Sequence, residues 1–188
     1  MEPAMISALI VYGTRYGATT RTSEEVAAVL RKEGVEVQVV NAKNEKVKDI
    51  AEYDLVIVGS GIQIFRWTGE PEDFLKKFQK ELPKKKVALF VSAGAQAIAA
   101  REGKTEEVET ARKKYLLEKA AKYNLQPISL GLFGGVYDFK KWPWWAGKAK
   151  PAAKQQLEAA GFKETNGIYD TRDWNAIRNW AKELAAKI

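Results

Sequence analysis

Near its start the chain reads Ile10-Val11-Tyr12-Gly13-Thr14-Arg15-Tyr16-Gly17-Ala18-Thr19. An apolar strand is predicted to end here, and a loop of glycine and hydroxyl residues leads into a helix. Thr14 and Thr19 can present hydroxyl groups, while Gly17 lets a ligand approach the backbone N–H groups closely. Because the positive end of the helix dipole lies at the same place, we predict a loop that binds an anion such as a phosphate.

The simplest alternative is an ordinary turn between a strand and a helix, since short motifs are weak evidence. Two well-known phosphate loops do not fit. A Walker loop needs a lysine that this stretch lacks, and a dinucleotide-binding fingerprint needs Gly-x-Gly-x-x-Gly after the strand.

The composition of the chain excludes much chemistry. Its 188 residues suit one domain, residues 1–188, and they include no cysteine and no histidine. Disulfides, thiolate nucleophiles, imidazole zinc sites and Ser-His-Asp triads are therefore excluded. We expect no catalytic side chain and no metal site, so any redox chemistry must come from a bound organic cofactor.

The charge and the hydropathy pattern bear on partners and location. The formal net charge is +7, which favours an anionic partner without identifying it. No apolar run approaches the roughly 18 residues of a membrane span, and no leader pattern opens the chain. We expect a soluble, cytoplasmic protein.

Strand and helix patterns alternate along the chain, which predicts an α/β fold. Apolar runs at 55–58 and 87–91 are unbroken, as in strands covered on both faces, whereas strands near 35–39 and 128–132 alternate as edges do. With the strand at 6–12, we predict a five-stranded parallel sheet of order 2-1-3-4-5 with helices on both faces. The helices are expected from Thr19 or Thr22 to Glu33, after Pro71, over 105–123 and from about Thr171.

In this strand order a ligand should sit at the loops after the first and third strands. The third strand leads into Gly59-Ser60-Gly61-Ile62-Gln63-Ile64-Phe65-Arg66-Trp67-Thr68-Gly69. Its glycines permit unusual backbone conformations, and we predict that Phe65 and Trp67 stack on a planar ring.

At these residues the chain resembles the flavodoxin-domain family, which includes the menaquinone-dependent protoporphyrinogen oxidases. The loop from Thr14 to Thr19 resembles the flavodoxin loop for the phosphate of FMN, and further similarities are Gly59-Ser60-Gly61-Ile62, Phe133-Gly134-Gly135 and the segment 169–174. The resemblance implies a flavodoxin-like three-layer sandwich that binds FMN non-covalently. It assigns the cofactor to three groups of residues: Thr14, Arg15, Tyr16, Gly17, Ala18 and Thr19 at the phosphate; Gly59, Ser60, Gly61 and Ile62 on one side of the ring; and Ser92, Ala93, Gly94 and Ala95 on the other.

The chain departs from ordinary flavodoxins in three respects. The loop from Ser92 to Ala95 has no stacking aromatic residue, the chain is basic, and an insertion rich in tryptophan and lysine occupies about 137–160. We predict that this insertion, with Trp142, Trp144 and Trp145, approaches the flavin and controls access to it. A flap packed on the sheet edge is the alternative, and mixed tryptophan and lysine also suggest weak peripheral membrane contact.

Three functions are compatible with these observations. An FMN electron carrier comes first, with a redox protein partner such as an acidic ferredoxin. An FMN-dependent oxidoreductase acting on a quinone or a porphyrinogen comes second, and a flavin-free interaction domain comes third. Nucleic acid is not an expected partner, because no known binding module accompanies the charges.

Overall fold

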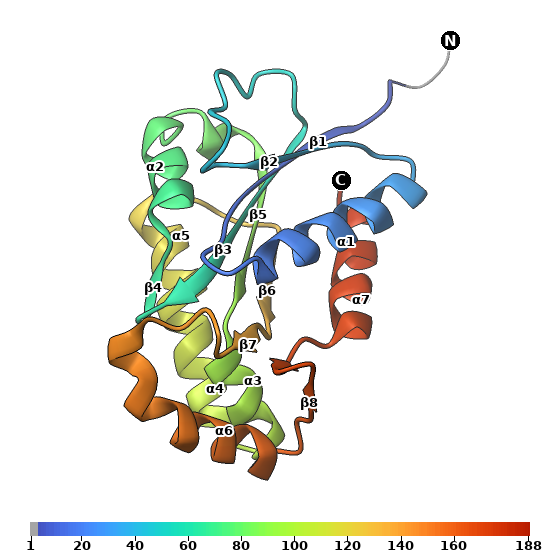
Figure 1. The fold of residues 1–188 in the computed structure, drawn as a ribbon. Coiled ribbons are helices and arrows are strands. Elements are labelled where there is room, and N and C mark those ends of the chain that lie inside the picture. Colours follow the sequence, from blue (N-terminus) through green and yellow to red (C-terminus); the bar gives the residue numbers. More distant parts are fainter. Residues whose placement is uncertain (1–3) are drawn as a thin grey trace.

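The computed structural model describes residues 4–188 and contains one central parallel sheet (Figure 1). The main path of the sheet has the order β2-β1-β3-β5-β6, and the short β4 pairs antiparallel with β3. This arrangement confirms the predicted order 2-1-3-4-5 and the α/β class. The strands are β1 (Ser7–Gly13), β2 (Glu36–Asn41), β3 (Leu55–Gln63), β4 (Arg66–Trp67), β5 (Lys86–Ser92) and β6 (Ser129–Phe133).

Helices cover both faces of the sheet, as the alternation of side chains along β1 requires. Ala8 and Ile10 pack with the helices α1 (Ala18–Lys32) and α7 (Trp174–Ala185). Leu9 and Val11 point to the opposite face, against α2 (Gly69–Lys77) and the segment that ends in α5 (Glu118–Lys122). The two apolar layers give the three-layer sandwich seen in Figure 1.

Two helix starts differ from the predicted ones, and one predicted helix has a π-helical turn inside it. The first helix begins at Ala18 after Gly17, whose φ of 93° is easiest for glycine, and not at Thr19 or Thr22. The last helix begins at Trp174 because the Asp173 carboxylate accepts the N–H of Ala176 at 3.0 Å. The predicted helix over 105–123 consists of α4 (Thr105–Arg112), the π-helical turn η2 (Lys113–Leu117) and α5.

The region of the insertion forms a second, smaller layer that the sequence did not predict. Its strands β7 (Val136–Asp138), β8 (Glu164–Thr165) and β9 (Ile168–Asp170) form an antiparallel sheet of order β7-β9-β8. Between them lie η3 (Trp144–Ala149) and α6 (Lys150–Ala159). Leu157, Phe162 and Tyr169 pack there against Ile98 of α3 (Gly94–Arg101).

The remaining element is the short turn η1 (Leu82–Lys84), which precedes β5. Within residues 4–188, no helix combines the length and the apolar character needed to cross a bilayer.

Candidate functional site

A cavity of about 480 Å³ lies at the carboxyl ends of the parallel strands. Its volume falls within the range of small-molecule sites, roughly 300–1,000 Å³. Its walls come from the loop before α1, the ends of β3 and β5, the start of α3, the face of α4 and η2, and the insertion. These are the places where α/β sheets of this order bind ligands.

Most of the residues predicted to bind the cofactor line this cavity. They are Thr14, Arg15, Tyr16, Ala18, Thr19, Gly61, Ile62, Phe65, Ser92, Ala93, Gly94 and Ala95.

Gly17, Gly59 and Ser60 do not line the cavity but support the loops that do. The N–H of Gly17 donates to the Thr14 hydroxyl at 3.0 Å, which fixes the turn before α1. An added Cβ at Gly59 would lie 2.1 Å from the ring of Phe90, so that position is packed against the core. The Ser60 hydroxyl is buried and accepts the N–H of Thr68 at 3.0 Å.

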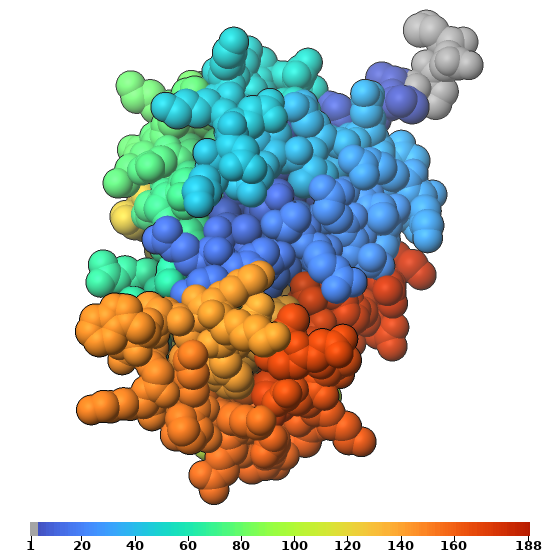
Figure 2. All heavy atoms as spheres, viewed as in Figure 1, coloured from blue at the N-terminus to red at the C-terminus, as the bar shows by residue number. Residues whose placement is uncertain are grey.

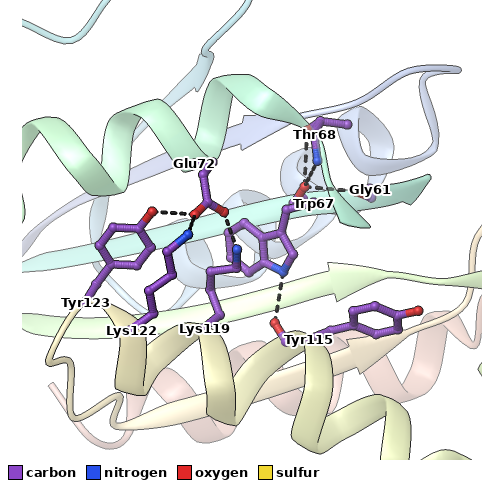
Figure 3. Close-up of polar contacts among 9 residues, drawn as sticks. Gly61, Trp67, Thr68, Glu72, Tyr115, Lys119, Lys122 and Tyr123 are labelled. Atoms are coloured by element: carbon purple, nitrogen blue, oxygen red, sulfur yellow. Dashed lines mark hydrogen bonds and ion pairs between the residues drawn. The ribbon is translucent and has the colours of Figure 1, made fainter. Parts of the chain in front are cut away.

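Trp67 does not line the cavity, and the prediction that it stacks on a planar ring has to be corrected (Figure 3). The side chain is buried in the core between the sheet and α2, because β4 turns it inward. Its indole N–H donates to the backbone carbonyl of Tyr115 at 2.9 Å. Tyr115 lies in the π-helical turn η2 and itself lines the cavity, a role that the sequence did not predict.

Thr19 is the most informative polar residue in the cavity wall. It is 0% exposed, and within residues 4–188 its hydroxyl has no hydrogen-bond partner. Buried polar groups are nearly always paired, and the unpaired N–H groups of the first turn of α1 point to the same place. An added Cβ at Gly61 would lie 3.2 Å from the Thr19 hydroxyl, so this glycine lets β3 end close to it.

The positive groups around this loop suit an anion. No acidic residue lies in the first turn of α1. The Arg15 guanidinium donates to the amide oxygen of Gln63 at 2.7 Å, and the Lys141 ammonium group donates to the carbonyl of Tyr16 at 3.3 Å. Figure 2 shows the insertion in contact with the N-terminal loop.

An ion pair between the buried side chain of Arg172 and the exposed Asp170 joins the segment before α7 to α1. Arg172 binds both carboxylate oxygens of Asp170, at 2.8 and 2.7 Å, and also donates to the carbonyl of Ala18 at 3.1 Å. Burial alone would raise the pKa of Asp170, but the hydrogen bonds from Arg172 lower it below its usual value. The pair therefore stays charged and holds the start of α1 in place.

The insertion supplies the aromatic groups that the Ser92 loop lacks. Tyr137 packs against Gly94, where an added Cβ would lie 2.3 Å from the tyrosine ring. Burial raises the pKa of Tyr137 to about 12, so the phenol stays protonated at neutral pH. Trp142 packs edge-on against Phe139 at 4.9 Å, and Trp142 and Trp145 both line the cavity.

Fold and site together define a flavodoxin-like α/β protein with a threonine- and glycine-containing loop before α1 and an aromatic-walled cavity at the carboxyl ends of its strands. The sequence matches the flavodoxin domain family over residues 9–148. The chain therefore belongs to the flavodoxin family. The cofactor of that family is FMN, and the unpaired Thr19 hydroxyl, the helix terminus and the largely apolar cavity fit its phosphate and ring.

Individual relatives are distant. The protoporphyrinogen IX dehydrogenase [quinone] of Escherichia coli K12 is 22% identical over 184 residues, which cover 94% of this chain and 93% of that protein. A flavodoxin from the domain Archaea superposes with a TM-score of 0.53 at 18% identity, over 97% of this chain and 98% of that one. The Streptococcus pneumoniae TIGR4 flavodoxin gives 0.54 at 17% identity, over 97% and 99%. The structural likeness supports the fold.

Proposed function

We propose that this chain holds FMN in the cavity and transfers electrons between cellular redox partners. The observation that carries the proposal is the buried hydroxyl of Thr19, which has no partner within residues 4–188 and lies where a phosphate would accept from it. The phosphate would lie at the loop from Thr14 to Thr19. The ring would lie between Gly61-Ile62 and the loop from Ser92 to Ala95.

The residues of the chain have distinct roles in this arrangement. The N–H groups of the first turn of α1 and the Thr19 hydroxyl would donate to the phosphate, and Arg15 and Lys141 would offset its charge. Tyr137 and Trp142 would exclude water from the ring. FMN itself supplies the transfer of one or two electrons.

The chain has no histidine, so proton transfer at this site would use water, a tyrosine or Glu107, which also lines the cavity. Tyr115 and Tyr137 both line the cavity. Burial raises the pKa of each phenol, so both would serve as hydrogen-bond donors and hold their protons at neutral pH.

A second candidate function is the oxidation of a porphyrinogen with a quinone as acceptor. The E. coli relative has this substrate and acceptor class in its name and matches the chain nearly from end to end. The specific observation in its favour is the aromatic wall from the insertion, where Trp142, Pro143 and Trp145 extend the cavity beyond the flavodoxin loops. The pyrrole rings of a porphyrinogen, and the planar porphyrin that its oxidation yields, can pack on such surfaces.

The experiment has two parts, cofactor binding and electron acceptance. Purified protein should contain FMN, read from its absorbance, and should bind riboflavin much more weakly because riboflavin lacks the phosphate. FMN and riboflavin bound equally well would contradict the phosphate site.

The second part compares two acceptors on the same FMN-loaded protein. Electron exchange with a ferredoxin, without oxidation of protoporphyrinogen, would support the carrier. Oxidation of protoporphyrinogen with menadione as acceptor would support the dehydrogenase. Trp145→Ala, with Trp144→Ala as a matched tryptophan that does not line the cavity, separates the two, because oxidation of a porphyrinogen should respond to loss of the wall and electron exchange with a ferredoxin should not.

A further inference from the structure

A cluster of exposed apolar side chains surrounds the mouth of the cavity. Within residues 4–188, four of the six exposed large hydrophobic side chains lie on two turns, which we call the docking tips. Ile64 and Phe65 connect β3 to β4, and Trp144 and Trp145 begin η3. Figures 1 and 2 both place the turn between β3 and β4 directly beside η3, at the left edge of the molecule.

The first docking tip has apolar residues at backbone positions where hairpin loops usually have Asn or Gly. Ile64 and Phe65 form a two-residue hairpin loop with φ of 48° and 60°. Hairpin loops of this type favour Asn-Gly, and a β-branched residue is strained at positive φ. Ile64 and Phe65 are nonetheless 64% and 68% exposed, so intramolecular packing gives little reason for keeping them there. Such strain at an exposed apolar tip points to a binding role.

The second tip combines tryptophan with positive charge. Trp144 is 91% exposed, so packing within the described residues covers little of its side chain. Residues 139–157 contain five lysines and no acidic residue. Across the cavity mouth, the Lys114 ammonium group lies 5.3 Å from the centre of the Phe65 ring, which adds charge beside the first tip.

We infer that the docking tips bind the surface of an anionic lipid bilayer. Tryptophan and lysine side chains are the usual anchors at headgroup depth, where the indole lies among the headgroups and the ammonium group pairs with phosphate. A bilayer accommodates projecting side chains of any shape, whereas a protein partner would need a matching concave surface. Binding through both tips turns the mouth of the cavity toward the lipid.

Vesicle co-sedimentation tests the inference on the full-length, FMN-loaded protein. Mixed phosphatidylglycerol and phosphatidylcholine vesicles should bind it at low salt, and pure phosphatidylcholine vesicles should bind it far less. Raising the salt from about 0.1 M to 1 M should weaken binding, because the screening length falls from about 10 Å to 3 Å. Equal binding to both vesicles, or none to the anionic ones, would overturn the inference.

Matched variants locate the surface. Trp144→Ala should reduce the affinity about tenfold, which corresponds to withdrawing about 55 Å² of apolar surface at about 25 cal/mol per Å². Met5→Ala, an exposed apolar residue at the opposite end of β1, should have no effect. Lys140→Gln with Lys148→Gln should cost about fivefold per lysine. The same substitutions at Lys80 and Lys84, before β5, should cost little.

A final variant separates binding from folding. Replacing Ile64 and Phe65 by Asn and Gly gives the hairpin its preferred residues, so the protein should fold, and vesicle binding should still fall about tenfold or more. FMN content is read from the absorbance of the same samples, so a failure of lipid binding can be told from a failure of the cofactor site. If the chain binds an acidic ferredoxin through these tips and no vesicle, the tips are a protein interface and the inference is wrong.

Discussion

Replacing Thr19 by valine should move apoprotein stability and FMN affinity in opposite directions. Valine keeps the shape and nearly the helix propensity of threonine and removes only the hydroxyl. Because that hydroxyl is buried without a partner in residues 4–188, its loss should stabilise the apoprotein by about 1 kcal/mol.

The same substitution removes a donor to a phosphate dianion. A hydrogen bond to a charged group contributes roughly 1.5–3 kcal/mol, so FMN affinity should fall about ten- to a hundredfold. At a fixed excess of FMN, the gain in stability from the ligand should then be smaller by about 1.4–2.7 kcal/mol. The variant should therefore be more stable than the wild type without FMN and less stable with it.

Ser23→Ala is the matched control for this prediction. Ser23 also lies in α1, is fully buried, and has a hydroxyl without a partner in residues 4–188, but it does not line the cavity. Ser23→Ala should stabilise the apoprotein and leave its affinity for FMN unchanged. Urea unfolding followed by circular dichroism, and FMN titration followed by fluorescence quenching, measure the two quantities. If Thr19→Val keeps FMN affinity within about twofold, the phosphate assignment is refuted.

Three further substitutions test other parts of the site and its support. Trp67→Phe should lower the free energy of unfolding by about 1–3 kcal/mol, because the carbonyl of Tyr115 loses its hydrogen-bond donor. A shifted flavin absorbance in this variant would show instead that Trp67 contacts the flavin. Trp145→Ala should keep FMN but change the ratio of electron-transfer rates to a lipophilic quinone and to ferricyanide, and an unchanged ratio would exclude control of access by this residue. Burial would raise the pKa of Glu72, but hydrogen bonds from Lys119, Lys122 and Tyr123 lower it to about 2. The ionised carboxylate therefore stabilises the fold above pH 4.5, and this contribution is lost as the pH falls toward 2. Glu72→Gln should abolish this loss of folding stability at low pH, which is about 1–2 kcal/mol after allowing for solvent screening. Unfolding measured at several pH values checks it.

The sheet and the phosphate loop could be predicted because local patterns specify them. Unbroken apolar runs at 55–58 and 87–91 are typical of central strands, and the alternating run at 35–39 is typical of an edge strand. The strand order then placed the ligand loops at one edge, where the cavity lies. The two threonines that flank Gly17 in the sequence both line this cavity.

The direction of a side chain in a loop, by contrast, depends on distant contacts. Phe65 and Trp67 looked equivalent in the sequence, but pairing between β3 and β4 turns Trp67 into the core and leaves Phe65 at the cavity mouth. Tyr115 faces the cavity from a π-helical turn, and the helical periodicity of the sequence does not predict such a turn. The small sheet β7-β9-β8 also escaped prediction, because its strands have only two or three residues each.

The contacts that brace the loop before α1 join residues that are made at very different times during synthesis. Lys141 reaches the carbonyl of Tyr16 across 125 residues, and Arg172 reaches that of Ala18 across 154. All five strands of the parallel sheet are complete by Phe133, so the scaffold can assemble on the ribosome before either brace has emerged. The cofactor site would then be completed late in translation. A chain stalled between residues 134 and 172 would contain the sheet but not the complete FMN site.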